Sequence, residues 1–173
     1  MKINTLTLLA VVGFFIAGLQ QSAAQQKKIS IQINAPSNQL SYVAGEIKKA
    51  AAERNYTVKL SSALNNQANE DVVVKMIADS ASSLKIARDQ NLKMPDKLGW
   101  QCYAIRVKNN GKQKTIYVLG GDKTGAMYGG LDIAEAIRIQ TINTITNSDN
   151  KPYLDRRGIK FNIPLDLRTP SYT

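Results

Sequence analysis

Apolar residues change their spacing several times along this chain, from every second position to every third or fourth position and back. Between residues 28 and 34, isoleucines alternate with polar residues, which predicts a half-buried strand. Ser37 then offers a helix cap. Helical spacing follows over residues 38–53, in the apolar side chains of Leu40, Val43, Ala44, Ile47 and Ala51. A strand followed at once by an amphipathic helix restricts the fold to one in which helices pack on a sheet.

The rest of the chain continues this mixture of patterns. We expect further strands at residues 56–60, 71–79, 101–108 and 114–119, and further helices at residues 82–90 and 123–139. Asn109, Asn110 and Gly111 form a strong turn signal between the last two strands and predict a hairpin. Together the patterns predict an α+β fold, a small sandwich whose mixed or antiparallel sheet of about four to five strands carries two main helices on one face.

Residues 1–24 have the pattern of a secretory signal peptide. Lys2 precedes an apolar run that ends at Leu19, and the small residues Ser22 and Ala24 precede the expected cleavage site. The apolar run is about 14 residues long, whereas a membrane-spanning helix needs roughly 20. We therefore expect cleavage after Ala24, no membrane span in the mature chain, and a periplasmic or extracellular location.

The chain is strongly basic. It carries 23 lysines and arginines against 13 aspartates and glutamates, which gives a formal net charge of +10. Such an excess can indicate a nucleic-acid or anionic-surface partner. The basic residues are scattered, however, and the densest group is Arg156 and Arg157 with Lys160. Because basic residues are not interleaved with aromatic ones, we interpret the charge as a solvated surface and expect no nucleic-acid partner.

The absence of histidine and the single cysteine exclude several kinds of site. Without histidine, the chain cannot form a Ser-His-Asp or Cys-His catalytic group or a histidine-ligated metal site. Cys102 has no partner for an internal disulfide, and its alternating surroundings predict a small buried residue. The glutamates are not spaced as a catalytic carboxylate pair; they are Glu46, Glu53, Glu70 and Glu135. We therefore expect no catalytic residue, no metal site and no cofactor.

The segment from Gly120 to Gly125 follows an expected strand and opens an expected helix. At such a turn, backbone N–H groups can hold a phosphate or a carboxylate. Lys123 and Thr124 precede Gly125 here, whereas a phosphate-binding P-loop has its glycine before the lysine. The alternative interpretation, which we favour, is a tight strand-to-helix turn with Asp122 as the helix cap.

This turn and the helix after it resemble a known pattern. Residues 116–137 read IYVLGGDKTGAMYGGLDIAEAI. They are similar to the end of the small N-terminal α+β domain that precedes the catalytic barrel in family 20 β-hexosaminidases and in α-glucuronidases. There, a strand leads into Gly-x-Asp, a glycine turn, Tyr-Gly and an amphipathic helix. Here those places are filled by Gly121, Asp122, Gly125, Tyr128, Gly129 and Leu131.

The last residues extend the resemblance. The sequence from Arg157 to Phe161 resembles the start of the first barrel strand in these glycosidases, and the stretch up to Thr173 looks closest to exported Bacteroidetes-type α-glucuronidase-like proteins. Asp166 and Arg168 resemble the Asp-x-x-Arg segment at the end of that strand, with one intervening residue instead of two. Because the family's arginine contacts the sugar, the resemblance implies a substrate-binding role for Arg168.

The resemblance covers residues 28–173 and implies a division of the chain. Its parts are a signal peptide (1–24), an accessory α+β domain (28–140), a linker (141–152) and the truncated start of a catalytic TIM barrel (153–173). The implied function is that of a non-catalytic domain of an exported glycoside hydrolase acting on polysaccharide or glycan-derived sugars, with the missing barrel as its partner in cis. We expect no activity from this chain alone, because the family's catalytic carboxylates lie further along the barrel.

Two other interpretations remain open. A free-standing exported glycan-binding module would need an exposed aromatic platform, for which the candidates are Tyr42, Tyr56, Trp100, Tyr103, Tyr117 and Tyr128. A small enzyme in its own right has no supporting set of residues in the sequence. The exposure of the aromatic side chains therefore helps to separate the interpretations.

Overall fold

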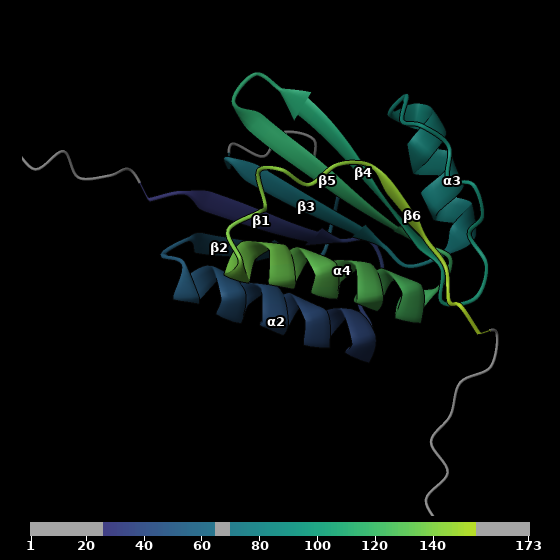
Figure 1. Cartoon of the computed structure of the whole chain (residues 1–173), viewed down its shortest axis with the longest axis horizontal. Coiled ribbons are helices and arrows are strands. Elements are labelled where there is room, and N and C mark those ends of the chain that lie inside the picture. The colour runs from purple at the N-terminus through teal and green to yellow at the C-terminus, as the bar shows by residue number, and fades with distance from the viewer. Residues whose placement is uncertain (1–25, 65–69, 155–173) are drawn as a thin grey trace, which may run out of the picture.

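The computed structural model describes residues 26–64 and 70–154. Its strands form one mixed sheet in the order β2-β1-β3-β5-β4-β6 (Figure 1). They are β1 (Lys28–Ile33), β2 (Thr57–Ser61), β3 (Val72–Ile77), β4 (Tyr103–Asn110), β5 (Gln113–Gly120) and β6 (Ser148–Asn150). The first three strands and β5 are parallel, and β4 runs antiparallel to β5 and β6. The expected signal peptide and the sugar-contact candidate Arg168 lie outside the described residues.

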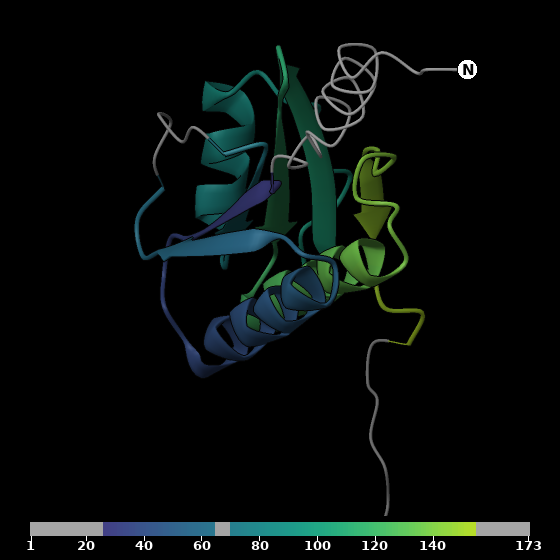
Figure 2. The same cartoon turned by 90° about the vertical axis from the view of Figure 1, so that its left-hand side faces the viewer.

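Helices of the described chain cover both faces of this sheet. α2 (Asn38–Glu53) and α4 (Lys123–Arg138) lie side by side on one face, and α3 (Ser80–Asp89) lies on the other, as Figure 1 and Figure 2 show. The predicted α+β class, with two main helices on one face, is confirmed. Within residues 26–64 and 70–154, no helix is long and apolar enough to cross a membrane.

β3 forms the centre of the sheet, and all six of its residues are buried. This explains why its sequence is almost continuously apolar rather than alternating. Val74 and Met76 pack beneath α2 and α4, while Ile77 belongs to the smaller core under α3. The exception is Lys75, whose ammonium lies 5.6 Å from the centre of the Tyr117 ring.

The packing of α4 depends on glycines as much as on its apolar residues. A Cβ at Gly129 would lie 2.6 Å from the Val118 side chain in the sheet, and one at Gly130 would lie 2.8 Å from Val43 of α2. The sequence predicts a stripe that includes Met127 and Leu131, but these two are only partly buried, because the glycines occupy the closest contacts. α4 therefore lies close both to the sheet and to α2.

All three described helices end in the same hydrogen-bonded turn. After α2, the N–H of Tyr56 donates to the carbonyl of Ala51 (2.9 Å), and the N–H of Asn55 donates to the carbonyl of Ala52 (3.2 Å). This is the Schellman pattern, which requires a left-handed residue and usually uses glycine there. At these three helix ends the left-handed residues are Asn55 (φ 57°), Asn91 (φ 52°) and Gln140 (φ 62°).

β6 is an element that the sequence does not predict, and it lies within the expected linker. It comprises three polar residues, which are too few to show an alternating pattern. It pairs with β4 through Ala104↔Asp149 and the two flanking positions. The described sheet therefore has six strands, and not the four to five that the sequence predicts. Its last edge strand is held by its neighbour β4 and not by apolar residues of its own.

The side chain of Arg106 in β4 secures this edge. It is 1% exposed. Its guanidinium donates hydrogen bonds to the carbonyl oxygens of Lys93 (2.8 Å), Met94 (3.3 Å), Ile105 (2.8 Å) and Ser148 (2.7 Å), and to the carboxylate of Asp149 (2.6 Å). The buried charge thus has both a counter-ion and carbonyl acceptors, as a buried guanidinium requires.

Candidate functional site

The glycine turn before α4 is closed by another segment of the chain. Asp122 caps α4, because its carboxylate accepts a hydrogen bond from the N–H of Gly125 (2.6 Å). A Cβ at Gly121 would lie 2.0 Å from the carbonyl oxygen of Gly99. A Cβ at Gly125 would lie 2.1 Å from the carbonyl oxygen of Cys102. The Asp122 carboxylate therefore accepts from the N-terminus of α4 as a bound anion would, and the interpretation as a capped turn is confirmed.

The glutamates of α2 take part in ion pairs with basic residues. Glu46 lies 2.7 Å from Lys49 and 2.9 Å from Arg138, and the hydrogen bonds from these two partners lower the pKa of Glu46. Arg138 also lies 3.6 Å from Glu53, so it ties the end of α4 to α2. In the described ranges, no three His, Cys, Asp or Glu side chains gather as a metal ion would need.

A groove of about 410 Å³ lies beside α4, where the described chain leaves the sheet. In it, the hydroxyl of Tyr103 donates a hydrogen bond to the carboxylate of Asp132. Burial raises the pKa of Asp132 and the charge of Glu135 adds to this rise, while the hydrogen bond from Tyr103 opposes it. Burial and the same hydrogen bond raise the pKa of Tyr103, so its hydroxyl keeps its proton at neutral pH. The pair therefore connects β4 to α4.

Replacing Asp132 with asparagine is expected to remove a pH-dependent cost to folding. The folded protein holds the Asp132 proton more tightly than the unfolded chain, so stability falls as pH rises from the ordinary value of 3.8 through the raised folded pKa. Asparagine still accepts from Tyr103 but does not ionise. The unfolding free energy of the Asp132→Asn variant minus that of the wild type should therefore be larger at about pH 7 than at about pH 3. Urea unfolding at both pH values measures this, and an unchanged difference would contradict it.

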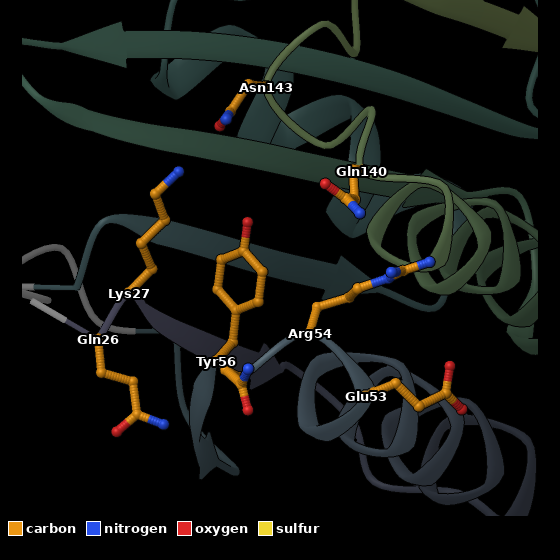
Figure 3. Close-up of a pocket in the computed structure, with 8 residues that line it drawn as sticks. Gln26, Lys27, Glu53, Arg54, Tyr56, Gln140 and Asn143 are labelled. Atoms are coloured by element: carbon orange, nitrogen blue, oxygen red, sulfur yellow. The ribbon is translucent and has the colours of Figure 1, made fainter. Parts of the chain in front are cut away.

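A wider hollow, of about 750 Å³, lies at the C-terminal ends of α2 and α4 (Figure 3). Three segments that are distant in the sequence form it: the residues before β1, the end of α2 and the loop after α4. Its lining residues are Gln26, Lys27, Glu53, Arg54, Asn55, Tyr56, Gln140 and Asn143. We call this cavity the helix-end hollow.

Aromatic, basic and amide groups meet in the helix-end hollow. The Tyr56 ring stands between the side chains of Lys27 and Arg54, and Gln140 and Asn143 extend toward it from the loop after α4 (Figure 3). Tyr56 is half-buried, whereas the other four are exposed. Such a combination offers a flat apolar surface, positive charge, and both donors and acceptors of hydrogen bonds.

The walls of the helix-end hollow are fixed by the fold. Lys114 donates to the carbonyl oxygens of Asn143 (2.6 Å) and Ile145 (3.1 Å), which holds the loop after α4 in place. Burial lowers the pKa of this lysine. The Arg54 guanidinium donates to the carbonyl of Arg138, so it links the ends of the two helices. The hollow is therefore a preformed feature of the described structure.

The structure separates the aromatic candidates from one another. Tyr117 is buried, and Tyr103 lies in the groove beside α4. Tyr42 and Trp100 are exposed, at 57% and 58%, but neither lines the helix-end hollow. Tyr56 is the aromatic candidate that the structure places in this hollow. Cys102 is buried, as the sequence predicts.

Sequence reasoning missed the partners of Tyr56 in this hollow. Lys27, Gln140 and Asn143 belong to no motif, and they come together only because β1, α2 and α4 pack as they do. Asn55 and Gln140 do share one feature, because each stands two positions after the end of its helix, but this feature alone does not indicate a cavity.

Comparisons with known proteins found little. No family model and no curated protein matches this chain. Among solved structures, one similar chain is a GH138 enzyme targeting pectin rhamnogalacturonan II, with 15% sequence identity and a TM-score of 0.48. The similarity covers 72% of this chain and 15% of that chain, so this chain spans a small part of that enzyme's length. The described fold is thus weakly similar to one segment of a glycoside hydrolase, and a similarity at this level carries no conclusion about activity.

Proposed function

We propose that this chain forms a non-catalytic accessory domain of an exported glycoside hydrolase that acts on polysaccharide or glycan-derived sugars. The supporting observation is what the residues behind the family resemblance do in the fold. Asp122 caps α4. Gly121 and Gly125 let the backbone of the loop before β4 lie against the start of this helix, and Gly129 lets side chains of the sheet do so. The shared pattern therefore consists of scaffold residues, as expected for a domain that supports chemistry located elsewhere.

The direction of the chain fits this role. β6 ends at Asn150 on the edge of the sheet, and the α+β layer is built from elements that precede this point in the chain (Figure 1). In the proposed protein, the sequence that resembles a first barrel strand comes directly afterwards, from Arg157 onward. The barrel would carry the catalytic carboxylates, and the α+β domain would pack against it.

Sequencing the source DNA through and beyond codon 173 tests this proposal. We expect the reading frame to continue for roughly the 250 residues that a (β/α)₈ barrel typically needs. We also expect the continuation to carry a pair of carboxylates near the ends of barrel strands. A stop codon directly after Thr173 would contradict the proposal and leave the free-standing glycan-binding module as the better interpretation.

Enzyme assays provide the matched control. The product of the continued frame should hydrolyse chromogenic glycosides, and the 173-residue chain should not, because it is expected to lack the carboxylate pair. Hydrolysis by the short chain at a comparable rate would place catalysis within these residues and overturn the accessory role.

A further inference from the structure

The helix-end hollow contains polar groups that the fold does not use. Within the described part of the chain, no hydrogen bond or ion pair engages the ammonium of Lys27, the hydroxyl of Tyr56 or the side-chain amide of Gln140. These groups gather around one cavity (Figure 3). Converging polar groups orient the ligand in a small-molecule site, and a volume of about 750 Å³ lies within the usual range of such sites.

Positive charge exceeds negative charge around the helix-end hollow. Lys27 and Arg54 line it, and Lys114 lies just behind its wall. Glu53 is the one acid among the lining residues, and Arg138 lies 3.6 Å from its carboxylate. Because the acid already has a basic partner while the Lys27 ammonium does not, the hollow favours a ligand with negative charge.

The two helix ends limit how much negative charge the helix-end hollow accepts. The C-termini of α2 and α4 carry partial negative charge, which repels an anion. Arg54 and the closing N–H groups satisfy several of their carbonyl oxygens but do not remove this field. A compact ion with two charges, such as sulfate or hydrogen phosphate, is therefore disfavoured. A single carboxylate on a larger neutral body is favoured.

The remaining groups indicate what that neutral body is. The Tyr56 ring offers a flat surface against which the apolar face of a sugar ring can pack. The amides of Gln140 and Asn143 can each donate to and accept from hydroxyl groups. A hydroxyl-rich ring with one carboxylate matches this combination.

We propose that the helix-end hollow binds a uronic acid residue of an oligosaccharide, with its carboxylate toward Lys27 and its ring beside Tyr56. The single negative charge follows from the residues of the hollow alone. The choice of a saccharide as the neutral body rests in part on the proposed function. The hollow would hold an acidic glycan near an attached catalytic domain without taking part in bond cleavage.

Isothermal titration calorimetry of the full chain with defined oligosaccharides tests the inference. The probes are glucuronate and galacturonate trisaccharides, their neutral glucose and galactose counterparts, and inorganic phosphate. We expect an acidic trisaccharide to bind at least about tenfold more tightly than its neutral counterpart, because a charge-assisted hydrogen bond contributes about this factor. Equal binding of acidic and neutral sugars, no binding of either, or tighter binding of phosphate would overturn the inference.

Matched variants locate the binding. Lys27→Met removes one positive charge from the helix-end hollow, and Lys48→Met removes one from the exposed outer face of α2. We expect Lys27→Met to weaken binding of the acidic sugar by about tenfold and Lys48→Met to leave it unchanged. Asn143→Ala should weaken binding of both sugars. An equal loss in the two lysine variants would show non-specific attraction by a basic surface and contradict a site.

The uronate site and the proposed function can fail independently of each other. If the reading frame ends at codon 173 but uronates bind through Lys27, the accessory role fails and the uronate site stands. If the frame encodes a barrel and no uronate binds, the site fails alone.

Discussion

The Gly125→Ala variant is expected to lose at least about 3 kcal/mol of stability or to fail to fold, although alanine is the better helix former by about 1 kcal/mol. The added Cβ would lie 2.1 Å from the carbonyl oxygen of Cys102. That oxygen belongs to the backbone and also accepts a hydrogen bond from the N–H of Gly121 (2.8 Å), so it has no room to move without opening the turn. Urea unfolding followed by far-UV circular dichroism measures the loss.

Gly45 in α2 is the matched control for this prediction. It also lies inside a helix, but a Cβ built there has no neighbouring atom within 4 Å. Gly45→Ala should therefore stabilise the protein by about 0.5–1 kcal/mol, through helix propensity alone. If both glycine variants changed stability in the same direction, a clash with the Cys102 carbonyl oxygen would not explain why residue 125 must be glycine.

Replacing Arg106 with methionine is expected to destabilise the protein by at least about 2 kcal/mol, because several carbonyl oxygens around the buried guanidinium lose a charged donor. Methionine fills much of the same volume but removes the counter-ion of Asp149 and the donor that Arg106 provides to four carbonyl oxygens. β6 should detach first, because two of the lost bonds reach Ser148 and Asp149. Hydrogen exchange of the β4 amides that face β6 would report this local opening.

Two further variants separate burial from charge in this prediction. Arg88→Met removes an exposed arginine from α3 and should change stability by less than about 0.5 kcal/mol. Arg106→Lys keeps the charge but replaces the planar fork of donors, so it should recover only part of the loss. Full recovery by lysine would mean that charge alone holds this edge of the sheet.

The elements with a clear apolar period could be predicted from the sequence. The helix expected at residues 38–53 is α2 with the same bounds, and the hairpin signalled by Asn109, Asn110 and Gly111 joins β4 to β5. In both cases the pattern is local, because a cap, a period and a turn each involve residues that are close in sequence. β6 escaped prediction because its polar residues are positioned by Arg106, which is 42 positions away from Ser148.

The helix-end hollow could not be predicted in this way. Its cationic side chains, Lys27 and Arg54, are single charges in unremarkable contexts, and Gln140 follows a helix like many other polar residues. They become neighbours only through tertiary packing of α2, α4 and β1, which a one-dimensional pattern does not contain. The capped glycine turn, in contrast, was predictable because Asp122 lies directly before the helix that it caps.

The place of β1 in the sheet also determines when the protein can fold during synthesis. β1 is the first strand made, yet its neighbour β3 pairs with it at Ile29↔Val72, and β3 pairs with β5 at Val72↔Lys114. The layer over these strands is finished only when α4 has been made and has packed against α2. A nascent chain of this kind has a high contact order and folds late. We therefore expect the sheet and the helix layer over it to form only after the chain has been synthesised as far as the end of α4, so that the first strand waits for its partners throughout most of synthesis.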